Sequence, residues 1–346
     1  MQQSVLITGG AGFLGINLCR HLLRGGARLR SVDIAPFDYP ERHAVEVVQA
    51  DIRDAAAMER AMLGIDVVVH CAAALPRASA AEIHSTNVEG TRLLLARAEY
   101  ARVRRFVFIS STAVYGIPWH EPIVETDPLR GVGPYGVSKI LGEQSCIQAR
   151  AGGLYVPILR PKTFVGPERL GVFELLYQWA YEGRNFPVLG SGENPYQLLD
   201  VEDLCEVIEL CCRVDQSIAN DTFNVGAQQF GTMRENFQAV LDRAGHGGRV
   251  VSLPKVPAVL ALRLLQMLHL SPLYPWVYDT VGKESWVSIE RLQQRLSFTP
   301  RFSNRAALIR NYDWYAAHRS EFIGKSGRTH RLPWRHGLLE LAKYAF

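Results

Sequence analysis

Tyr135 and Lys139 could together remove a proton from an alcohol. They stand four residues apart in YGVSK, residues 135–139, and this spacing places both side chains on one face of a helix. A lysine ammonium close to a phenol favours the phenolate and lowers its pKa from about 10 towards the working range. A serine hydroxyl in the upstream segment SSTAVYG, residues 110–116, could hold the same oxygen. Because this spacing is common by chance, the pair alone would more often be an ordinary exposed helix pair.

A glycine-rich loop near the N-terminus gives the pair a context. The apolar run 5–7 leads into TGGAGFLG, residues 8–15, and an amphipathic helical pattern follows. Glycines at this spacing allow a tight turn, and they let the backbone and a helix N-terminus approach a pyrophosphate. The predicted contacts of this loop with a dinucleotide are Gly9, Gly12, Phe13, Leu14 and Gly15.

The second predicted strand, Arg30–Asp33, ends in an acidic residue 18 positions after Gly15. A carboxylate at this place accepts hydrogen bonds from ribose hydroxyls and repels a 2′-phosphate. No arginine follows Asp33 directly to hold such a phosphate. The sequence therefore favours NAD over NADP, the alternative being that Asp33 is a solvated loop residue.

The elements that must position these residues alternate regularly along the first half. Further strands are predicted at 45–48, 67–70 and 106–109, with helical patterns at 54–63 and 86–101. This alternation predicts an α/β fold with a doubly wound parallel sheet of the Rossmann type. Ligands bind beyond the carboxyl ends of such strands. The residues predicted at that edge are Asp51, Ile52, Cys71, Ala72, Ala73 and Asn87.

Composition narrows the class of protein. The chain has 346 residues, 48% of them hydrophobic and 21% charged, with a net charge of +4. A charge this small does not indicate a nucleic-acid partner. The six cysteines include no CxxC pair, so buried free thiols are expected and no metal site is predicted. Without a signal peptide or a long apolar run, we expect a cytoplasmic protein.

Taken together, these segments resemble the NAD-dependent epimerase/dehydratase family, the extended short-chain dehydrogenases. The match is dense over residues 4–167 and thinner beyond. The segments that carry it are TGGAGFLG, Asp33, ADI at 50–52, HCAA at 70–73, TNVEGT at 86–91, SSTAVYG, YGVSK, LRPKTFVGP at 159–167, LLDVEDL at 198–204 and FNVG at 223–226.

The resemblance implies a role for each catalytic candidate. Tyr135 would be the base, Lys139 would orient the nicotinamide ribose and lower the pKa of the tyrosine, and Ser111 would be the hydroxyl partner. Ser111 is chosen over Ser110 because it stands four residues before Tyr115, as the catalytic hydroxyl residue of the family does. Ser110, Tyr135, Lys139 and Arg160 join the predicted NAD contacts. A homodimer is usual in this family.

The residues after Ser111 bear on the reaction. Family members that eliminate water carry an Asp–Glu pair there and decarboxylating members carry a Glu, whereas this chain has Thr112 and Ala113. The resemblance therefore implies an epimerase or a simple dehydrogenase. SSTAVYG looks most like the version in nucleotide-sugar 4-epimerases, which oxidise a ring carbon and return the hydride to its other face. A non-catalytic NAD-binding regulator is a third possibility, which the intact Tyr135 and Lys139 disfavour.

The second half differs from the sugar epimerases at two expected diphosphate contacts. Thr163 stands where they usually carry an asparagine, and Gln197 or Tyr196 stands where they carry an arginine. Lys162, Arg169 or Lys283 could supply charge instead, or be solvated surface residues. The Arg160–Pro161 dipeptide resembles the 3β-hydroxysteroid dehydrogenase branch as much as the sugar branch. The predicted substrate contacts are Thr112, Ala113, Lys162, Thr163, Gln197 and Lys283. The substrate is thus a sugar nucleotide or a lipid-like alcohol.

Three regions are predicted along the chain. Residues 1–167 form the NAD-binding domain, to which 196–226 return, and 168–195 with 227–323 form a smaller substrate-binding domain. A helix beginning near Pro257 could pack into that domain, cover a lipidic substrate or lie on a membrane. The basic, tryptophan-bearing tail 324–346 could fold back onto the protein or make a peripheral membrane contact.

Overall fold

The computed structural model describes residues 3–117, 119–267 and 283–322. The chain divides into two compact units. The first comprises Met1–Lys162, Val201–Gly226 and Val287–Thr299, and the second comprises Thr163–Asp200, Ala227–Trp286 and Pro300–Phe346. The tail predicted at 324–346 lies outside the described residues.

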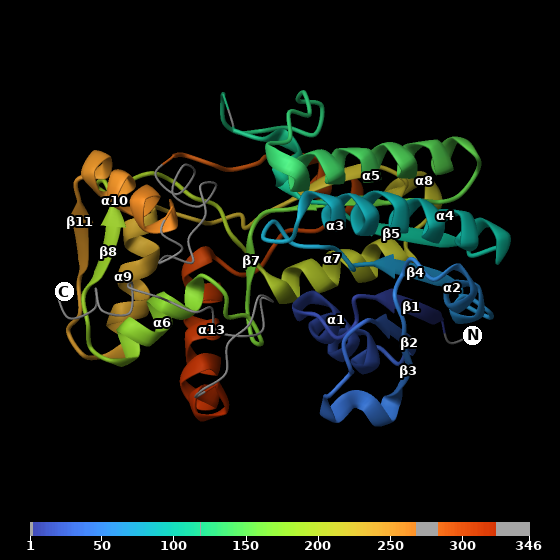
Figure 1. Ribbon diagram of the computed structural model, residues 1–346, viewed down its shortest axis with the longest axis horizontal. Coiled ribbons are helices and arrows are strands. Elements are labelled where there is room, and N and C mark those ends of the chain that lie inside the picture. The colour runs from blue at the N-terminus through green and yellow to red at the C-terminus, as the bar shows by residue number, and fades with distance from the viewer. Residues whose placement is uncertain (1–2, 118, 268–282, 323–346) are drawn as a thin grey trace. The chain divides into compact units, whose positions relative to one another are not determined.

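The first unit is built on a seven-stranded sheet in the order β10-β6-β5-β4-β1-β2-β3, and every neighbouring pair is parallel (Figure 1). Its strands are β1 (Ser4–Thr8), β2 (Arg28–Asp33), β3 (Val45–Gln49), β4 (Val67–His70), β5 (Arg105–Ile109), β6 (Ile158–Pro161) and β10 (Thr222–Val225). The strand order reverses at β1, where β2 and β4 lie on either side. The prediction of a doubly wound Rossmann sheet is confirmed, and such a sheet binds its ligand at this switch point.

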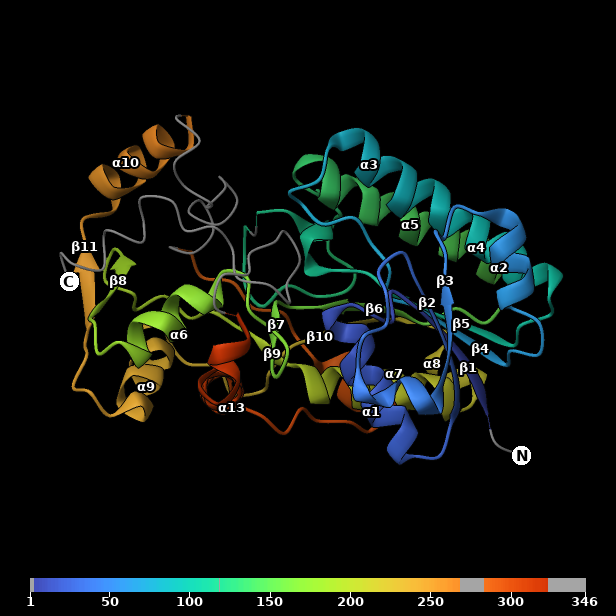
Figure 2. The same ribbon diagram turned by 60° about the horizontal axis from the view of Figure 1, so that its bottom comes forward.

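Helices cover both faces of this sheet. One face carries α2 (Ala55–Ala61), α3 (Ala80–His84), α4 (Thr91–Tyr100) and α5 (Gly133–Ala151), whereas α1 (Phe13–Arg24) and α7 (Val201–Arg213) lie on the other (Figures 1 and 2). The helical pattern predicted at 86–101 runs from α3 into α4 through a π-helical turn, η2 (Ser85–Gly90). The unit also contains η1 (Pro40–Ala44), η3 (Thr112–Tyr115), α8 (Gln216–Ala219) and α12 (Glu290–Leu296).

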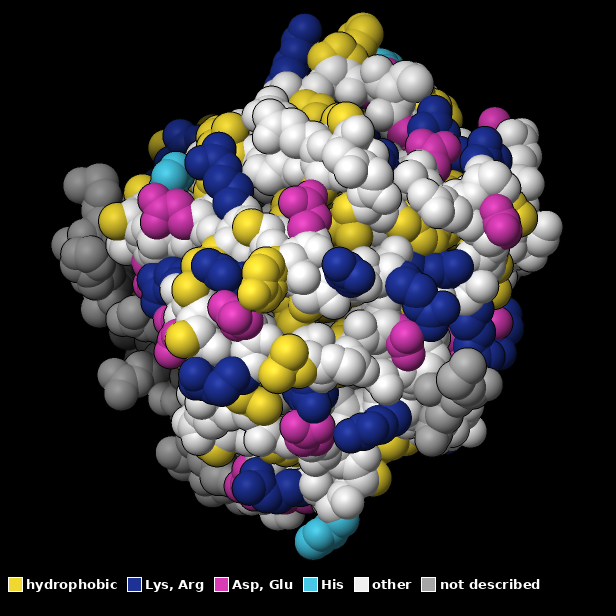
Figure 3. All heavy atoms as spheres, turned by 90° about the vertical axis from the view of Figure 1, so that its right-hand side faces the viewer, with side chains coloured by type: hydrophobic (Ala, Val, Ile, Leu, Met, Phe, Trp, Pro, Cys, Tyr) yellow, Lys and Arg dark blue, Asp and Glu magenta, His cyan; other side chains and the backbone are white. Residues whose placement is uncertain are grey.

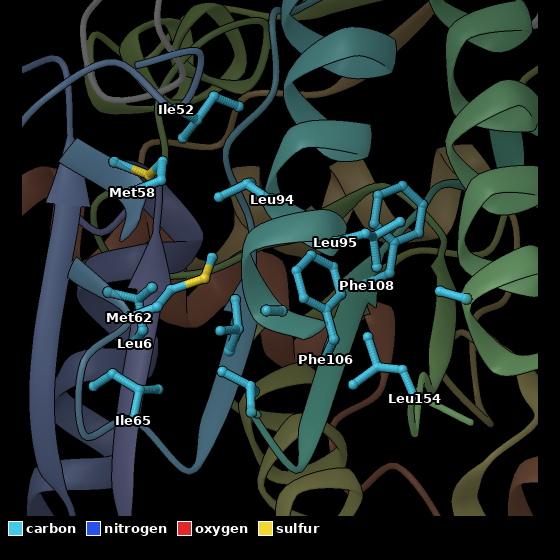
Figure 4. Packing of buried hydrophobic residues seen from close by; sticks show 14 of the residues in the cluster. Leu6, Ile52, Met58, Met62, Ile65, Leu94, Leu95, Phe106, Phe108 and Leu154 are labelled. Carbon is cyan, nitrogen blue, oxygen red and sulfur yellow. The ribbon is translucent and has the colours of Figure 1, made fainter. Parts of the chain in front are cut away.

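The core under α2, α4 and α5 is aliphatic and aromatic. Met58 from α2, Leu94 from α4 and Phe106 from β5 are fully buried, and Figure 4 shows them converging with their neighbours between the strands and the helices. Burial of side chains of this size stabilises the unit by roughly 1.5–3 kcal/mol each. The packing fixes the sheet and α5 as one body, so that a side chain on α5 keeps its place over the strand ends.

The second unit has smaller sheets than the first. Two short parallel pairs, β7 (Phe164–Val165) with β9 (Leu199–Asp200) and β8 (Phe186–Leu189) with β11 (Val250–Leu253), accompany its helices. The helices are α6 (Phe173–Tyr181), α9 (Met233–Ala244), α10 (Lys255–Met267), α13 (Asn304–His318) and η4 (Arg319–Phe322). Tyr177, Val240 and Leu308 are buried together in its core. The apolar helix expected near Pro257 is α10, although its predicted end lies outside the described residues.

The division differs from the predicted domain boundaries by a few residues. Residues 163–167 and 196–200 fall in the second unit because β7 pairs with β9 and with no strand of the large sheet. Residues 287–299 fall in the first unit, where Val287 forms a β-bridge with Ile123. The sequence does not show that 163–167 and 196–200 belong to the second unit, because two-residue strands leave no periodicity.

Two surface and chemical features complete the description. None of the helices in the described ranges combines the length and apolar character needed to cross a bilayer. Basic and acidic side chains are interspersed on the face drawn in Figure 3. The six cysteines are free thiols, five of them buried and Cys71 partly buried.

Candidate active site

The glycine loop has the shape that a dinucleotide requires. Gly9 has a φ of +72°, and a Cβ added there would lie 2.7 Å from the backbone nitrogen of Ala72. A Cβ on Gly15 would lie 2.2 Å from the carbonyl oxygen of Gly9. No side chain caps the N-terminus of α1, which begins directly after Gly12. The loop and the helix N-terminus therefore fit a pyrophosphate, which would accept hydrogen bonds from the first backbone N–H groups of α1.

Asp33 lies at the end of β2, next to this loop. Its Oδ2 accepts a hydrogen bond from Ala11 N at 3.0 Å, and its Oδ1 accepts one from Ala35 N at 2.9 Å. Both bonds fix the carboxylate at the strand end. This placement fits the ribose hydroxyls of NAD.

The other residues predicted at the strand ends differ in how far their side chains are exposed to solvent. Asp51 is bonded to Arg53, whose guanidinium holds the pKa of Asp51 below its usual range. The side chain of Ile52 is buried in the core, where its Cδ1 lies against Gly90, so only its backbone can reach a ligand. Cys71, Ala72 and Ala73 follow β4 and are partly buried. Their contacts with NAD stay predictions.

Asn87 belongs to a buried hydrogen-bond chain that starts at the glycine loop. The Thr8 hydroxyl lies 2.8 Å from His70 Nδ1, and His70 Nε2 lies 3.0 Å from the Thr91 hydroxyl. Thr91 donates to the carbonyl of Asn87, so Nε2 of His70 carries the proton and Nδ1 accepts from Thr8. Burial lowers the pKa of His70 to about 3, and the charge of Lys139 acts in the same direction.

The amide of Asn87 connects this chain to α5. Its Oδ1 accepts from Ala74 N at 2.7 Å, and its Nδ2 donates to the Ser138 hydroxyl at 3.1 Å. Ser138 in turn donates to the carbonyl of Tyr135. Asn87 thus fixes the loop after β4 relative to the first turns of α5. A direct contact of Asn87 with NAD stays a prediction.

The three catalytic candidates lie on the segment after β5 and on the helix α5, which contacts the end of that strand. Ser111 caps η3, and its Oγ accepts from Ala113 N at 3.1 Å. Lys139 is buried on α5 and donates from Nζ to the carbonyl of Ile109 at 2.9 Å, with Nζ 5.9 Å from the centre of the Tyr135 ring. Burial lowers the pKa of Lys139 to about 8. The strand end therefore holds both the serine segment and the ammonium.

Glycines bring α5 close to the serine segment. A Cβ on Gly136 would lie 2.9 Å from the carbonyl oxygen of Ala113, so the turn that carries Tyr135 packs directly on η3. Thr112 and Ala113, two of the predicted substrate contacts, are the first two residues of η3 and are partly buried. A larger residue at position 136 would separate Tyr135 from the strand end.

Arg160 lies inside the first unit, where Nε and Nη2 donate to the two carboxylate oxygens of Glu143 at 2.9 and 2.6 Å. Nη1 donates to the Tyr115 hydroxyl at 2.7 Å and to the carbonyl of Glu125 at 3.0 Å. Four of its five N–H donors are used in this way. Ser110 places its hydroxyl 2.5 Å from Glu143 Oε1. The contacts of Arg160 and Ser110 with NAD stay predictions.

The predicted substrate residues are divided between the two units. Lys162 follows β6 in the first unit, and burial lowers its pKa to about 7. In the second unit, the carbonyl of Thr163 accepts from Leu199 N, and the buried Gln197 donates from Nε2 to the carbonyl of Ala227 at 2.8 Å. Lys283 is exposed, and its carbonyl accepts from Asn194. Substrate contacts for these residues stay predictions.

Sequence reasoning missed several residues on which the site depends. Glu143 stands four residues after Lys139, and this spacing alone could have placed it on the same helix face. Tyr115 bonds to Asn224 Oδ1 at 2.7 Å, and no local signal in the sequence connects residues 109 positions apart. Nothing in the sequence indicated that the hydroxyls of Thr8 and Thr91 contact the two ring nitrogens of His70.

Comparison with known proteins gives the family that the sequence resembles. The model of the NAD dependent epimerase/dehydratase family matches residues 5–226. An uncharacterized protein of Sinorhizobium fredii is 36% identical, over 99% of this chain and 86% of the relative. A dTDP-glucose 4,6-dehydratase of Streptomyces niveus is 28% identical over 91% of this chain and 94% of its own. A 3 beta-hydroxysteroid dehydrogenase/Delta 5→4-isomerase of Mycobacterium tuberculosis is 26% identical over 90% of each.

Solved structures share the fold over nearly the whole chain. An epimerase of Methanothermobacter thermautotrophicus superposes with a TM-score of 0.77 at 24% identity, covering 92% of this chain and 94% of that one. The dTDP-glucose 4,6-dehydratase DesIV of Streptomyces venezuelae, solved with NAD and TYD bound, gives 0.71 at 26% identity, covering 92% and 98%. The family match and the relatives, together with the glycine loop and Asp33, agree. The chain belongs to the NAD-dependent epimerase/dehydratase family and is an NAD-dependent enzyme of the extended short-chain dehydrogenase type.

Proposed function

We propose that this enzyme epimerises a nucleotide-activated sugar by oxidising and re-reducing its carbon 4. The observation that carries the proposal is a site with a proton-transfer pair, Tyr135 and Lys139, beside a Ser111 segment whose next two residues cannot ionise. Nucleotide-sugar epimerases and dehydratases among the relatives and structural neighbours support the substrate class.

Each catalytic residue acts on one atom. The Tyr135 phenolate takes the proton from the 4-hydroxyl, and the nearby Lys139 ammonium stabilises the phenolate. The Ser111 hydroxyl holds the same oxygen and orients it. Bound NAD supplies the hydride acceptor and donor at this site. After the keto sugar has presented its other face to the cofactor, Tyr135 returns the proton to the oxygen on carbon 4, and carbon 4 then has the opposite configuration.

The residues after Ser111 favour epimerisation over dehydration or decarboxylation. Elimination of water across carbons 5 and 6 needs an acid and a base beyond the redox tyrosine. Thr112 and Ala113 occupy the first positions of η3, where dehydratases of this family carry an acidic pair. A threonine hydroxyl and a methyl group supply neither, so the 4-keto sugar is reduced again rather than dehydrated.

The test begins with the purified chain. We expect denaturation to release NAD(H) in near-stoichiometric amount, since a redox-neutral epimerase keeps its cofactor. A panel of UDP- and dTDP-sugars is then added, and the products are separated while reduced-nicotinamide absorbance is followed. The proposal predicts a 4-epimeric product with no net NADH. A 4-keto-6-deoxy product would contradict it in favour of a dehydratase.

A second candidate function is the oxidation of an apolar alcohol. It is favoured by Arg160–Pro161, which resembles the hydroxysteroid branch, and by the exposed aliphatic side chains of Val256, Leu260 and Leu264 on α10. These three residues recur every four positions on one face of that helix. Such an enzyme exchanges NAD at each turnover. Stoichiometric NADH formed from a sterol or isoprenoid alcohol, with no reaction of any sugar nucleotide, would establish this second function.

A further inference from the structure

Glu143 is a carboxylate with no exposure to solvent, placed directly behind the catalytic lysine. The residue is fully buried, and it stands one helical turn after Lys139 on α5. Residues at this spacing are neighbours on a helix surface. A buried carboxylate is costly unless it is paired and hydrogen-bonded, so its partners explain why it is there.

Two strands contribute those partners. From the end of β5, the Ser110 hydroxyl lies 2.5 Å from Glu143 Oε1, and from β6 the guanidinium of Arg160 forms a two-pronged ion pair at 2.9 and 2.6 Å. The side chains of the ion pair are 6% and 1% exposed. Bidentate pairs of this kind are the strong, geometrically specific ones. Glu143 is therefore held in place by both strands.

The same ion pair reaches the segment that follows Ser111. Arg160 Nη1 donates to the hydroxyl of Tyr115, the last residue of η3, and Tyr115 donates to Asn224 on β10. Burial raises the pKa of Tyr115 to about 12, so its hydroxyl stays protonated and can donate. The network thus joins α5, β5, β6, β10 and η3 beneath the catalytic residues.

The Lys139 ammonium lies in an otherwise unfavourable place for a charge. Burial lowers the pKa of Lys139, whereas Cys71, then Glu143 and then Cys146 raise it, and Glu143 is the carboxylate among these three. Its carbonyl acceptor, Ile109, is the residue just before Ser110, so the same strand end holds both Lys139 and Glu143. The titratable groups that face Lys139 are His70, Cys71, Tyr135, Glu143 and Cys146.

We propose that Glu143 is a positioning residue for catalysis: with Arg160 as its fixed partner, it keeps the Lys139 ammonium charged and in place beside Tyr135. The inference rests on the proposed role of Lys139 in the proposed function. It also gives Arg160 a function different from cofactor binding. The buried pair acts through charge, and this distinguishes it from a pair that merely joins α5 to the sheet.

The small number of lysines makes a direct test practicable. The sequence contains six, which are Lys139, Lys162, Lys255, Lys283, Lys325 and Lys343. Carbon-13 labelling of the lysine ε-carbons gives one NMR signal for each, and the Lys139 signal is assigned by its loss in Lys139→Arg. We would titrate this signal with pH in the NAD-loaded protein and in the double variant Glu143→Gln/Arg160→Met. The double variant avoids leaving either buried charge without its partner, a change that is strongly destabilising.

The Lys139 titration midpoint should fall in the double variant, because Glu143, one helical turn along α5, favours the protonated ammonium. Ser110→Ala is the matched control: it removes a hydrogen bond to Glu143 and keeps both charges, so the midpoint should not move. A wild-type midpoint in the double variant would overturn the proposal. An equal fall in Ser110→Ala would also overturn it, because packing rather than charge would then control Lys139. If the double variant does not fold, the Lys139 signal is titrated in Glu143→Gln alone, which retains an amide acceptor for Arg160. The same two outcomes would then overturn the proposal.

This titration needs no substrate and no turnover, so its failure is separable from that of the proposed function. If Tyr135→Phe remained fully active, the proposed mechanism would fail while the Lys139 titration could still respond to Glu143. If Tyr135→Phe abolished turnover and the midpoint did not move, only the role of Glu143 would fail.

Discussion

At the scale of single residues, the site depends on one buried ammonium. Lys139 is buried, and its Nζ donates to the carbonyl of Ile109. In the proposed mechanism, the Lys139 ammonium stabilises the Tyr135 phenolate only while Lys139 remains charged.

Replacement of Tyr135 by phenylalanine removes the proton acceptor and little else. We expect turnover to fall by about a hundred- to ten-thousand-fold, the usual contribution of a positioned acid or base. The amount of NAD released on denaturation should stay near that of the unaltered protein. Tyr100→Phe, at an exposed position of α4, is the control and should be fully active. Full activity of Tyr135→Phe would exclude Tyr135 as the base.

Asp33 should decide between the two nicotinamide cofactors. Its carboxylate is fixed by Ala11 N and Ala35 N, and a 2′-phosphate placed there would meet a negative charge. Asp33→Ala should weaken NAD about tenfold or more and narrow its advantage over NADP, measured by titration of the apoprotein with each cofactor. Asp313→Ala, on α13 in the second unit, is the control. An unchanged ratio of the two dissociation constants would contradict the assignment.

At the scale of elements, α1 and α7 are joined by a histidine between two carboxylates. His21 on α1 lies 3.3 Å from Glu202 and 2.6 Å from Glu209, both on α7. The hydrogen bond to Glu202 is the largest of the effects that raise the pKa of His21 above its usual value. Because α1 carries the glycine loop at its N-terminus, this contact also anchors the NAD site.

The raised pKa gives the contact a definite pH dependence. The stabilisation is fully present below the ordinary histidine pKa of about 6.5, and it is lost as the pH rises through the higher pKa of the folded state. His21→Gln should therefore lower the free energy of unfolding by about 1 kcal/mol at mildly acidic pH, and by less at alkaline pH. Urea unfolding at several pH values measures this, with the exposed His43→Gln as the control. An equal loss at all pH values would show that the charge of His21 is not involved.

Elements with a long periodic pattern could be predicted from the sequence, and short or tertiary ones could not. The strands β1, β3, β4 and β5 were visible because apolar residues cluster in each of them. The two-residue strands β7 and β9 leave no such pattern. The contact of Thr91, directly after the π-helical turn Ser85–Gly90, with His70 exists only in the folded chain.

The site divides in the same way. Glycine, aspartate, serine, tyrosine and lysine positions were predictable because their spacing is set by one loop or one helix. Arg160 was predicted to contact the cofactor, and the sequence does not show that Glu143, 17 residues earlier on another element, also binds its guanidinium. A basic residue near a site can stabilise the fold or bind the ligand, and only its contacts in the folded chain distinguish these roles.

At the scale of the whole molecule, the oligomeric state is the open prediction. Family resemblance implies a homodimer through two helices of the nucleotide-binding half. Tyr100 on α4 and Val137 and Ile147 on α5 are exposed apolar side chains on candidate helices. We expect a dimer by light scattering and a monomer for Ile147→Glu, whereas Leu63→Glu, exposed beyond the end of α2, should leave the dimer intact. A monomeric unaltered chain would contradict the prediction.

In the proposed reaction, a hydride leaves carbon 4 of the sugar and returns to the same carbon without leaving the enzyme. The most direct measurement uses the nucleotide sugar turned over by the enzyme, with deuterium at carbon 4, and locates the label in the product by NMR. We predict that the 4-epimer keeps its deuterium at carbon 4, that no labelled reduced cofactor appears in solution, and that Tyr135→Phe forms no product. Deuterium found in free NADH, or lost from carbon 4 with a 6-deoxy product, would contradict the account.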